Sequence, residues 1–127
     1  MKISLDNYPE NHNRIDGYRD GTIIINTTEY HRSLIIIPEQ PVLDWPPDTF
    51  TDIAVQHLDI VISHQPDILL LGTGNNMQFP APELIENLFL AGIGLEVMDS
   101  WSACRCFNLL LSEGRKVAAA LILEQQD

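Results

Sequence analysis

The chain has 127 residues, of which 45% are hydrophobic and 20% are charged, and this composition is typical of a globular protein that forms one domain over residues 1–127. No segment reaches the roughly 20 apolar residues that a membrane-spanning helix requires, so no membrane insertion is expected. The formal net charge is −11, and no Lys or Arg lies between Arg32 and Arg105. Such an acidic protein is expected to repel nucleic acid and anionic lipid, because both are bound mainly through their phosphates.

The acidic residues are concentrated where the cations are missing. Ten of them lie between Glu39 and Asp99. The simpler explanation is a solvated face that keeps the protein in solution, and a docking surface for a basic partner is the alternative.

The sequence also predicts a cellular compartment. The first residues contain no apolar signal region and carry Asp6, Glu10 and Asp16, which argues against a secretion signal or a transit peptide. Two cysteines, Cys104 and Cys106, are too few for a disulfide framework, which suits a reducing environment. A cytoplasmic location is therefore expected.

The first third of the chain is predicted to be β-structure. Two β-branched runs, Thr22–Asn26 and Ser33–Pro38, bracket a polar turn region and predict an N-terminal β-hairpin. Four prolines in "PEQPVLDWPPDTF" indicate an irregular connector after the hairpin. We expect the antiparallel members of the sheet to come from this hairpin.

The hydrophobic period then changes to that of a helix. In the segment from Asp52 to His64, apolar residues recur at helical spacing at Ala54, Leu58 and Val61, which predicts one helix there.

Strands and helices alternate in the rest of the chain. Pro82 stands where a helix begins and Gly92 where it ends, and Asp99 and Gly114 bracket the next helix in the same way. Three apolar runs are predicted to lie side by side inside a sheet: Ile68–Leu71, Leu95–Met98 and Val117–Leu123. This order predicts an α/β fold, with a mixed sheet covered by helices on both faces.

Three segments together carry a family resemblance: "ILLLGTG", "GLEVMDSWSACRCFNLLLSEGR" and "VAAALI". The chain resembles the Mth938-like family, a domain of unknown function in bacteria and archaea, which also occurs in a mitochondrial assembly factor of respiratory complex I. The likeness runs from about Asn26 to Ile122. It implies a three-layer α/β/α fold with a central mixed sheet, no firmly established catalytic activity, and a protein partner.

The Gly72-Thr73-Gly74 loop is the candidate ligand site. It follows a predicted strand, and in open α/β sheets ligands bind beyond the carboxyl ends of strands. The loop is either a tight backbone corner or the wall of a pocket for a small anionic ligand. Seven residues form the candidate pocket: Gly72, Thr73, Gly74, Asn75, Asp99, Arg105 and Asn108.

A nucleotide site at this loop is disfavoured. Met77 stands where the third glycine of a dinucleotide-binding motif would fall, and no phosphate-binding lysine follows. Pro80 and Pro82 remove N–H donors from the start of the helix.

Three members of the candidate set have structural alternatives. Asp99 either caps the next helix or acts as an acid or base. Asn108 either latches a neighbouring backbone segment or contacts a ligand. Arg105 either anchors an anion or lies at the surface.

No catalytic residues, metal ligands or cofactor are predicted. His57 and His64 are seven residues apart, which is not the spacing of a helical metal pair. The favoured hypothesis is therefore a non-enzymatic interaction protein, similar to an assembly factor, with an unidentified protein partner. The alternative is a small-molecule or anion-binding protein, with or without catalysis, that uses the candidate pocket.

Overall fold

The computed structural model describes residues 12–124. Its strands are β1 (Ile15–Arg19), β2 (Thr22–Ile25), β3 (Thr28–Tyr30), β4 (Leu34–Ile36), β5 (Leu43–Asp44), β6 (Ile68–Gly72), β7 (Gly94–Met98) and β8 (Val117–Leu121). Its helices are the 3₁₀ turns η2 (Phe50–Asp52) and η3 (Val55–Leu58) and the α-helices α1 (Asp59–His64), α2 (Pro82–Leu90) and α3 (Ser100–Ser112).

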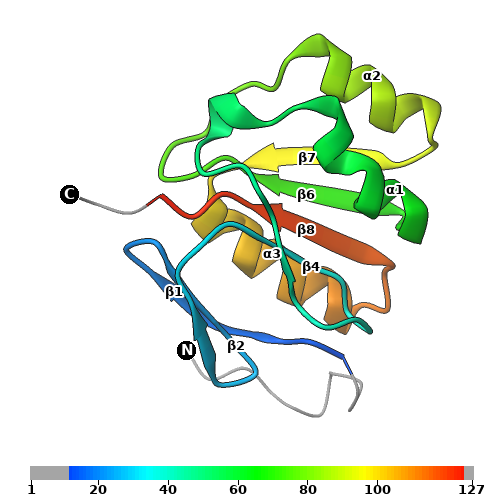
Figure 1. Ribbon diagram of the computed structural model, residues 1–127. Coiled ribbons are helices and arrows are strands. Elements are labelled where there is room, and N and C mark those ends of the chain that lie inside the picture. Colours follow the sequence, from blue (N-terminus) through cyan, green and yellow to red (C-terminus); the bar gives the residue numbers. More distant parts are fainter. Residues whose placement is uncertain (1–11, 125–127) are drawn as a thin grey trace.

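A five-stranded mixed sheet forms the centre of the fold, in the order β5-β4-β8-β6-β7 (Figure 1). β6 pairs in parallel with both β7 and β8, with Ile68 opposite Gly94 on one side and Val117 on the other. β4 and β5 complete the sheet in antiparallel pairings. The predicted side-by-side arrangement of the three apolar runs is therefore confirmed. The prediction that all three lie inside the sheet is wrong for Leu95–Met98, because β7 is the outermost strand and no β7 residue is fully buried.

The prediction for the N-terminal strands is only half right. β4 joins the central sheet antiparallel to β8, as expected of the Ser33–Pro38 run. The Thr22–Asn26 run does not, because β2 lies in a separate antiparallel sheet of order β1-β2-β3. The reason lies in two tight turns, since Asp20, Gly21, Asn26 and Thr27 all have positive φ. Two consecutive residues of positive φ close a two-residue hairpin, so β2 folds back on β1 and β3.

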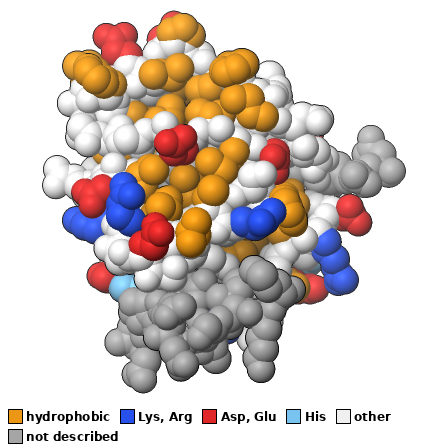
Figure 2. Space-filling model, turned by 180° about the vertical axis from the view of Figure 1, so that it is seen from behind, with side chains coloured by type: hydrophobic (Ala, Val, Ile, Leu, Met, Phe, Trp, Pro, Cys, Tyr) orange, Lys and Arg blue, Asp and Glu red, His pale blue; other side chains and the backbone are white. Residues whose placement is uncertain are grey.

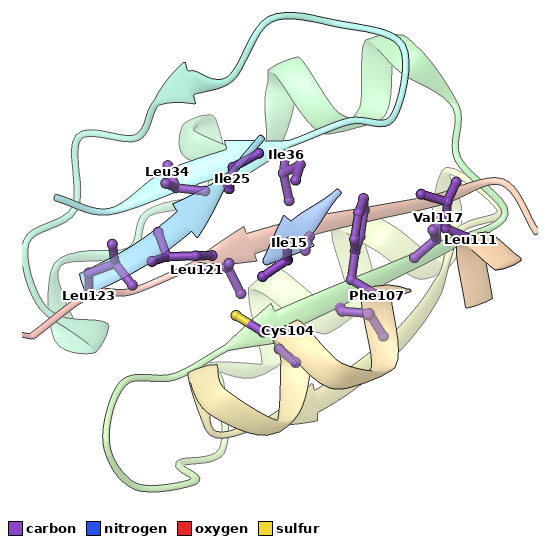
Figure 3. Close-up of a cluster of buried hydrophobic side chains, with 14 residues drawn as sticks. Ile15, Ile25, Leu34, Ile36, Cys104, Phe107, Leu111, Val117, Leu121 and Leu123 are labelled. Atoms are coloured by element: carbon purple, nitrogen blue, oxygen red, sulfur yellow. The ribbon is translucent and has the colours of Figure 1, made fainter. Parts of the chain in front are cut away.

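Helices cover both faces of the central sheet. α1 and α2 lie on one face, where Val61 and Leu88 are buried. α3 lies on the other face, together with the three-stranded sheet. In Figure 3, Phe107, Cys104 and Leu111 of α3 point into the core that they share with Ile15 and Val117. The predicted three layers are confirmed, with β1 to β3 added to the layer of α3.

The helix predicted from Asp52 to His64 is broken. Only α1 is α-helical, and it follows the two short 3₁₀ turns η2 and η3. Ile53 and Ala54 are extended, and the Ala54 N–H donates to Nδ1 of His57 at 2.8 Å. This side-chain bond satisfies a backbone donor that a continuous helix would have used itself, so the helix restarts after it.

The later helix ends follow the sequence signals. Pro82 is the first residue of α2, and Gly92 has a φ of +77° just beyond the helix end. Gly114 has a φ of +78° just beyond the end of α3. None of the helices in residues 12–124 combines the length and the apolar composition of a membrane-spanning segment.

Candidate functional site

The loop after β6 is tied to the start of α3. The Gly74 N–H donates to Ser100 Oγ at 3.0 Å, and the Ser100 N–H donates to the Gly74 carbonyl at 2.9 Å. Ser100 Oγ in turn donates to the Ile122 carbonyl at 2.6 Å, just beyond β8. One buried hydroxyl therefore joins the loop, α3 and the last strand.

Thr73 bonds within its own loop. Its side chain is fully buried, and Oγ1 donates to the Asn76 carbonyl at 2.6 Å and accepts from the Gln78 N–H at 3.1 Å. Asn75 is exposed. The Thr73 hydroxyl, which was predicted to line a ligand pocket, is thus already hydrogen-bonded to the protein.

Both glycines of this loop have a structural reason, which is close packing at Gly72 and a positive φ at Gly74. A Cβ at Gly72 would approach Ser100 Oγ and Leu121 Cδ2 to 2.8 Å, which is closer than side chains tolerate. Gly74 has a φ of +103°, and a side chain there would collide with the carboxylate of Glu124. Because Glu124 brings a negative charge to this corner, the site is electrostatically unfavourable for a small anion.

Asp99 and Asn108 have structural roles. Asp99 caps α3, since its Oδ1 accepts from the Ser102 N–H and its Oδ2 from the Ser102 hydroxyl, both at 2.8 Å. Asn108 is buried and latches β1, because its amide donates to the Ile15 carbonyl at 2.6 Å and accepts from the Ile15 N–H at 3.1 Å.

Arg105 lies on the exposed side of α3. Its guanidinium stacks over the ring of Trp101, 4.7 Å from the ring centre, and Trp101 is 49% exposed. The other tryptophan, Trp45, is buried and donates from Nε1 to the His57 carbonyl at 2.9 Å.

The structure therefore brings only part of the candidate set together. Gly72 to Asn75 and Asp99 lie at the junction of β6 and α3, whereas Asn108 points to β1 and Arg105 stacks on Trp101. Ligand binding by these residues stays a prediction.

Two buried groups have perturbed acidities. Burial, reinforced by nearby negative groups, raises the pKa of Tyr18 to about 12. Burial also raises the pKa of the Cys104 thiol, which lies in the core with Phe107. A thiol of raised pKa is a poor nucleophile, so Cys104 acts as a small apolar core residue.

A cavity of about 330 Å³ opens where β8 begins, at the opposite end of the strands from the glycine loop. His12, His64, Arg115 and Lys116 are among its lining residues, and Nε2 of His12 lies 2.9 Å from a Glu39 carboxylate oxygen. Among residues 12–124, no three His, Cys, Asp or Glu side chains are grouped so as to hold a metal.

An exposed apolar patch lies on and beside α2, and its residues were not predicted from the sequence. We call it the α2 patch, and it consists of Phe79, Ile85, Phe89 and Leu90, which are 83%, 46%, 77% and 75% exposed. Seen from behind, in Figure 2, hydrophobic side chains gather at the top of the molecule, on the side of α2, and across the middle. The signal was present in the sequence, because Leu84 and Leu88 already fill the inner face of α2 and leave its other apolar residues without a core to join.

Comparison with known proteins identifies relatives over most of the chain. The family described as "Protein of unknown function (DUF498/DUF598)" matches residues 15–122. The chain is 36% identical over 107 residues to the "13 kDa major membrane protein" of Francisella tularensis subsp. holarctica, and the match covers 83% of this chain and 86% of the relative.

A second relative is a eukaryotic assembly factor. The chain is 33% identical over 113 residues to the "NADH dehydrogenase [ubiquinone] 1 alpha subcomplex assembly factor 3" of Xenopus tropicalis, and the match covers 87% of this chain. It spans only 61% of the length of that assembly factor.

The fold is shared with solved structures. A Bordetella pertussis protein described as a Mth938-like domain superimposes with a TM-score of 0.83 at 28% identity, and the match covers 100% of this chain and 95% of that protein. The family match over residues 15–122, together with this structural likeness, shows that the chain belongs to the DUF498/DUF598 family of Mth938-like proteins.

Proposed function

We propose that this protein works by binding another protein through the α2 patch, in a role similar to that of an assembly factor. The observation that carries the proposal is the high exposure of the two phenylalanines, Phe79 at 83% and Phe89 at 77%. Neither ring is needed for the core, which is completed on this side by Leu84 and Leu88.

The physical reason is the energy of apolar burial. Covering an exposed aromatic side chain releases about 25 cal/mol for each Å² that leaves water. Large aromatic residues at the centre of an interface dominate its binding energy. A patch that combines two phenylalanines with Ile85 and Leu90 is well suited to such a centre.

The relatives support the same role. The Xenopus relative is named an assembly factor, and a protein that helps to assemble a complex must bind other proteins. The residues of the candidate pocket offer less, because Thr73, Asp99 and Asn108 already bond to the protein itself.

The test is capture of the partner by the tagged full chain in its native cell, followed by binding measurements with the purified partner. Phe89→Ser should weaken the dissociation constant by about 30-fold, which corresponds to about 2 kcal/mol for a central aromatic residue. Isothermal titration calorimetry measures this change.

Ile60→Ser is the matched control, because Ile60 is an exposed apolar residue on α1, outside the α2 patch. It should change the dissociation constant by less than about threefold. The wild type should capture a partner that Phe89→Ser does not capture. If no protein behaves in this way, the proposed function is wrong.

A further inference from the structure

β7 is the outermost strand of the central sheet beside α2. The Gly94 N–H donates to the Asp67 carbonyl at 3.0 Å, and the Met98 carbonyl accepts from the Thr73 N–H at 2.9 Å. Backbone groups of successive strand residues point to alternate sides. Glu96 therefore faces β6 with its backbone, whereas the N–H and C=O groups of Leu95 and Val97 point away from the sheet.

This outer edge is long enough to accept another strand. Within residues 12–124, no strand lies beyond β7. Unpaired strand edges of this kind bind extended segments of other proteins through backbone hydrogen bonds.

Two residues of the α2 patch, Ile85 and Phe89, lie on the side of α2 that faces this edge, as the helix geometry and the handedness of the connection indicate. Ile85 and Phe89 each follow a buried leucine by one residue, so they project about 100° to one side of the buried stripe of α2. The β6–α2–β7 connection joins parallel strands and is expected to be right-handed. With that handedness, the side of α2 that carries Ile85 and Phe89 faces the outer edge of β7.

The two faces of β7 differ in chemistry. Leu95 and Val97 pair with Leu69 and Leu71, which are buried on the face of α2. Glu96 pairs with Leu70, which is buried on the face of α3, and the Glu96 side chain is exposed. An added strand would thus meet apolar groups on one face and a carboxylate on the other.

The charge of this region decides which partner fits. Glu83 and Glu86 on α2 and Glu96 on β7 are all exposed, and no Lys or Arg lies between Arg32 and Arg105. If β7 paired in full antiparallel register with β7 of a second copy, Glu96 would lie opposite Glu96. Like charges placed directly opposite each other destabilise a strand pair, so the charges favour a basic partner over a second copy.

We propose that the outer edge of β7 accepts an extended segment of a basic partner protein as an added strand. Apolar side chains of that segment cover Ile85 and Phe89, and a Lys or Arg lies opposite Glu96. This inference rests on the proposed function and adds to it the mode of binding and the chemistry of the partner.

The probe is a nine-residue peptide of alternating valine and lysine, added to the full chain at 150 mM salt. It should slow hydrogen exchange of the Leu95 and Val97 amides, measured by NMR, by at least about tenfold, because both amides become hydrogen-bonded. A peptide with glutamate in place of lysine, and a lysine peptide with N-methylated backbone, should give no protection.

Two charge variants refine the test. Glu96→Gln should weaken binding of the lysine peptide by about threefold, as expected of one cross-strand charge pair. Asp59→Asn removes an exposed acid from α1 and should leave the affinity unchanged. Fluorescence anisotropy measures both affinities.

Three outcomes would overturn strand addition by a basic partner: unchanged exchange at Leu95 and Val97, equal binding of the N-methylated peptide, or sedimentation showing a dimer that protects these amides without peptide.

The partner recovered by capture separates this inference from the proposed function. If binding of that partner depends on Phe89 but leaves Leu95 and Val97 unprotected, strand addition is wrong and the proposed function stands. If neither effect is seen, both are wrong.

Discussion

The glycine loop after β6 and the outer edge of β7 lie on neighbouring strands, yet they differ in how their polar groups are used. At the loop, Gly74 and Ser100 bond to each other, and Thr73 bonds to the loop itself. At the edge, Leu95 and Val97 point their backbone groups outward, on a strand that contacts α2.

This difference shows that a recognisable sequence motif does not indicate where backbone groups and apolar side chains remain free to bind a partner. The glycines of the loop are explained by close packing of Gly72 against Ser100 and Leu121 and by the positive φ of Gly74. The β7 edge carries no motif, but it has backbone groups and apolar area left over for a partner. Substitutions of hydrogen-bonded side chains of α3 should therefore reduce stability, whereas substitutions at the β7 edge and the α2 patch should affect binding alone.

Among the hydrogen-bonded side chains, the largest loss of stability is expected for Asn108→Ala. This change leaves the N–H and C=O groups of Ile15 buried without partners, at a cost of about 3 kcal/mol in the free energy of unfolding. Urea denaturation measures the loss. Asn75→Ala is the control, because Asn75 is exposed, and it should change stability by less than about 0.5 kcal/mol. Equal stabilities of the two variants would contradict the latch between α3 and β1.

A smaller loss is expected for Ser100→Ala. The Gly74 N–H and the Ile122 carbonyl lose their shared partner, which should cost about 2 kcal/mol and speed hydrogen exchange at Gly74. Urea denaturation and NMR exchange measure the two effects. Ser63→Ala removes an exposed hydroxyl from α1 and should be nearly neutral. If Ser100→Ala is as stable as the wild type, the loop is not held by this hydroxyl.

The smallest effect on stability is expected for Phe89→Ser, at the open edge. Its ring is largely exposed, so the free energy of unfolding should change by less than about 0.5 kcal/mol. The adjacent Leu88 is buried, and Leu88→Ala should cost about 3 kcal/mol in the same measurement. A large loss for Phe89→Ser would place the ring in the core and remove the contrast between the loop and the edge.

Local signals in the sequence predicted the elements whose formation depends on neighbouring residues. The apolar run of β6 marked an internal strand, and Asp99 and Gly114 marked the ends of α3. Two features were not predicted from the sequence. One is the Asp20-Gly21 turn, which folds β2 back on β1, and the other is the hydrogen bond from the Ala54 N–H to His57, which interrupts a helix.

The candidate site depended on distances that no local signal contains. Asp99 lies beside the loop because β6 and β7 end at the same edge of the sheet. Asn108 and Arg105 are three residues apart on α3 and lie only about 60° apart around the helix, yet Asn108 bonds to β1 whereas Arg105 stacks on Trp101. The elements that pack against α3 determine which partner each of these side chains meets.

The sequence by itself determined the alternation of strands and helices from Ile68 onward, the side-by-side placement of β8, β6 and β7 and the family of the chain, because apolar periodicity, caps and motifs act within short segments. Only the tertiary structure decided which polar groups were used up and which edge stayed open. Hydrogen-bond partners such as Ser100 and Ile122 lie far from Gly74 in the chain, and burial of a side chain depends on every element packed around it.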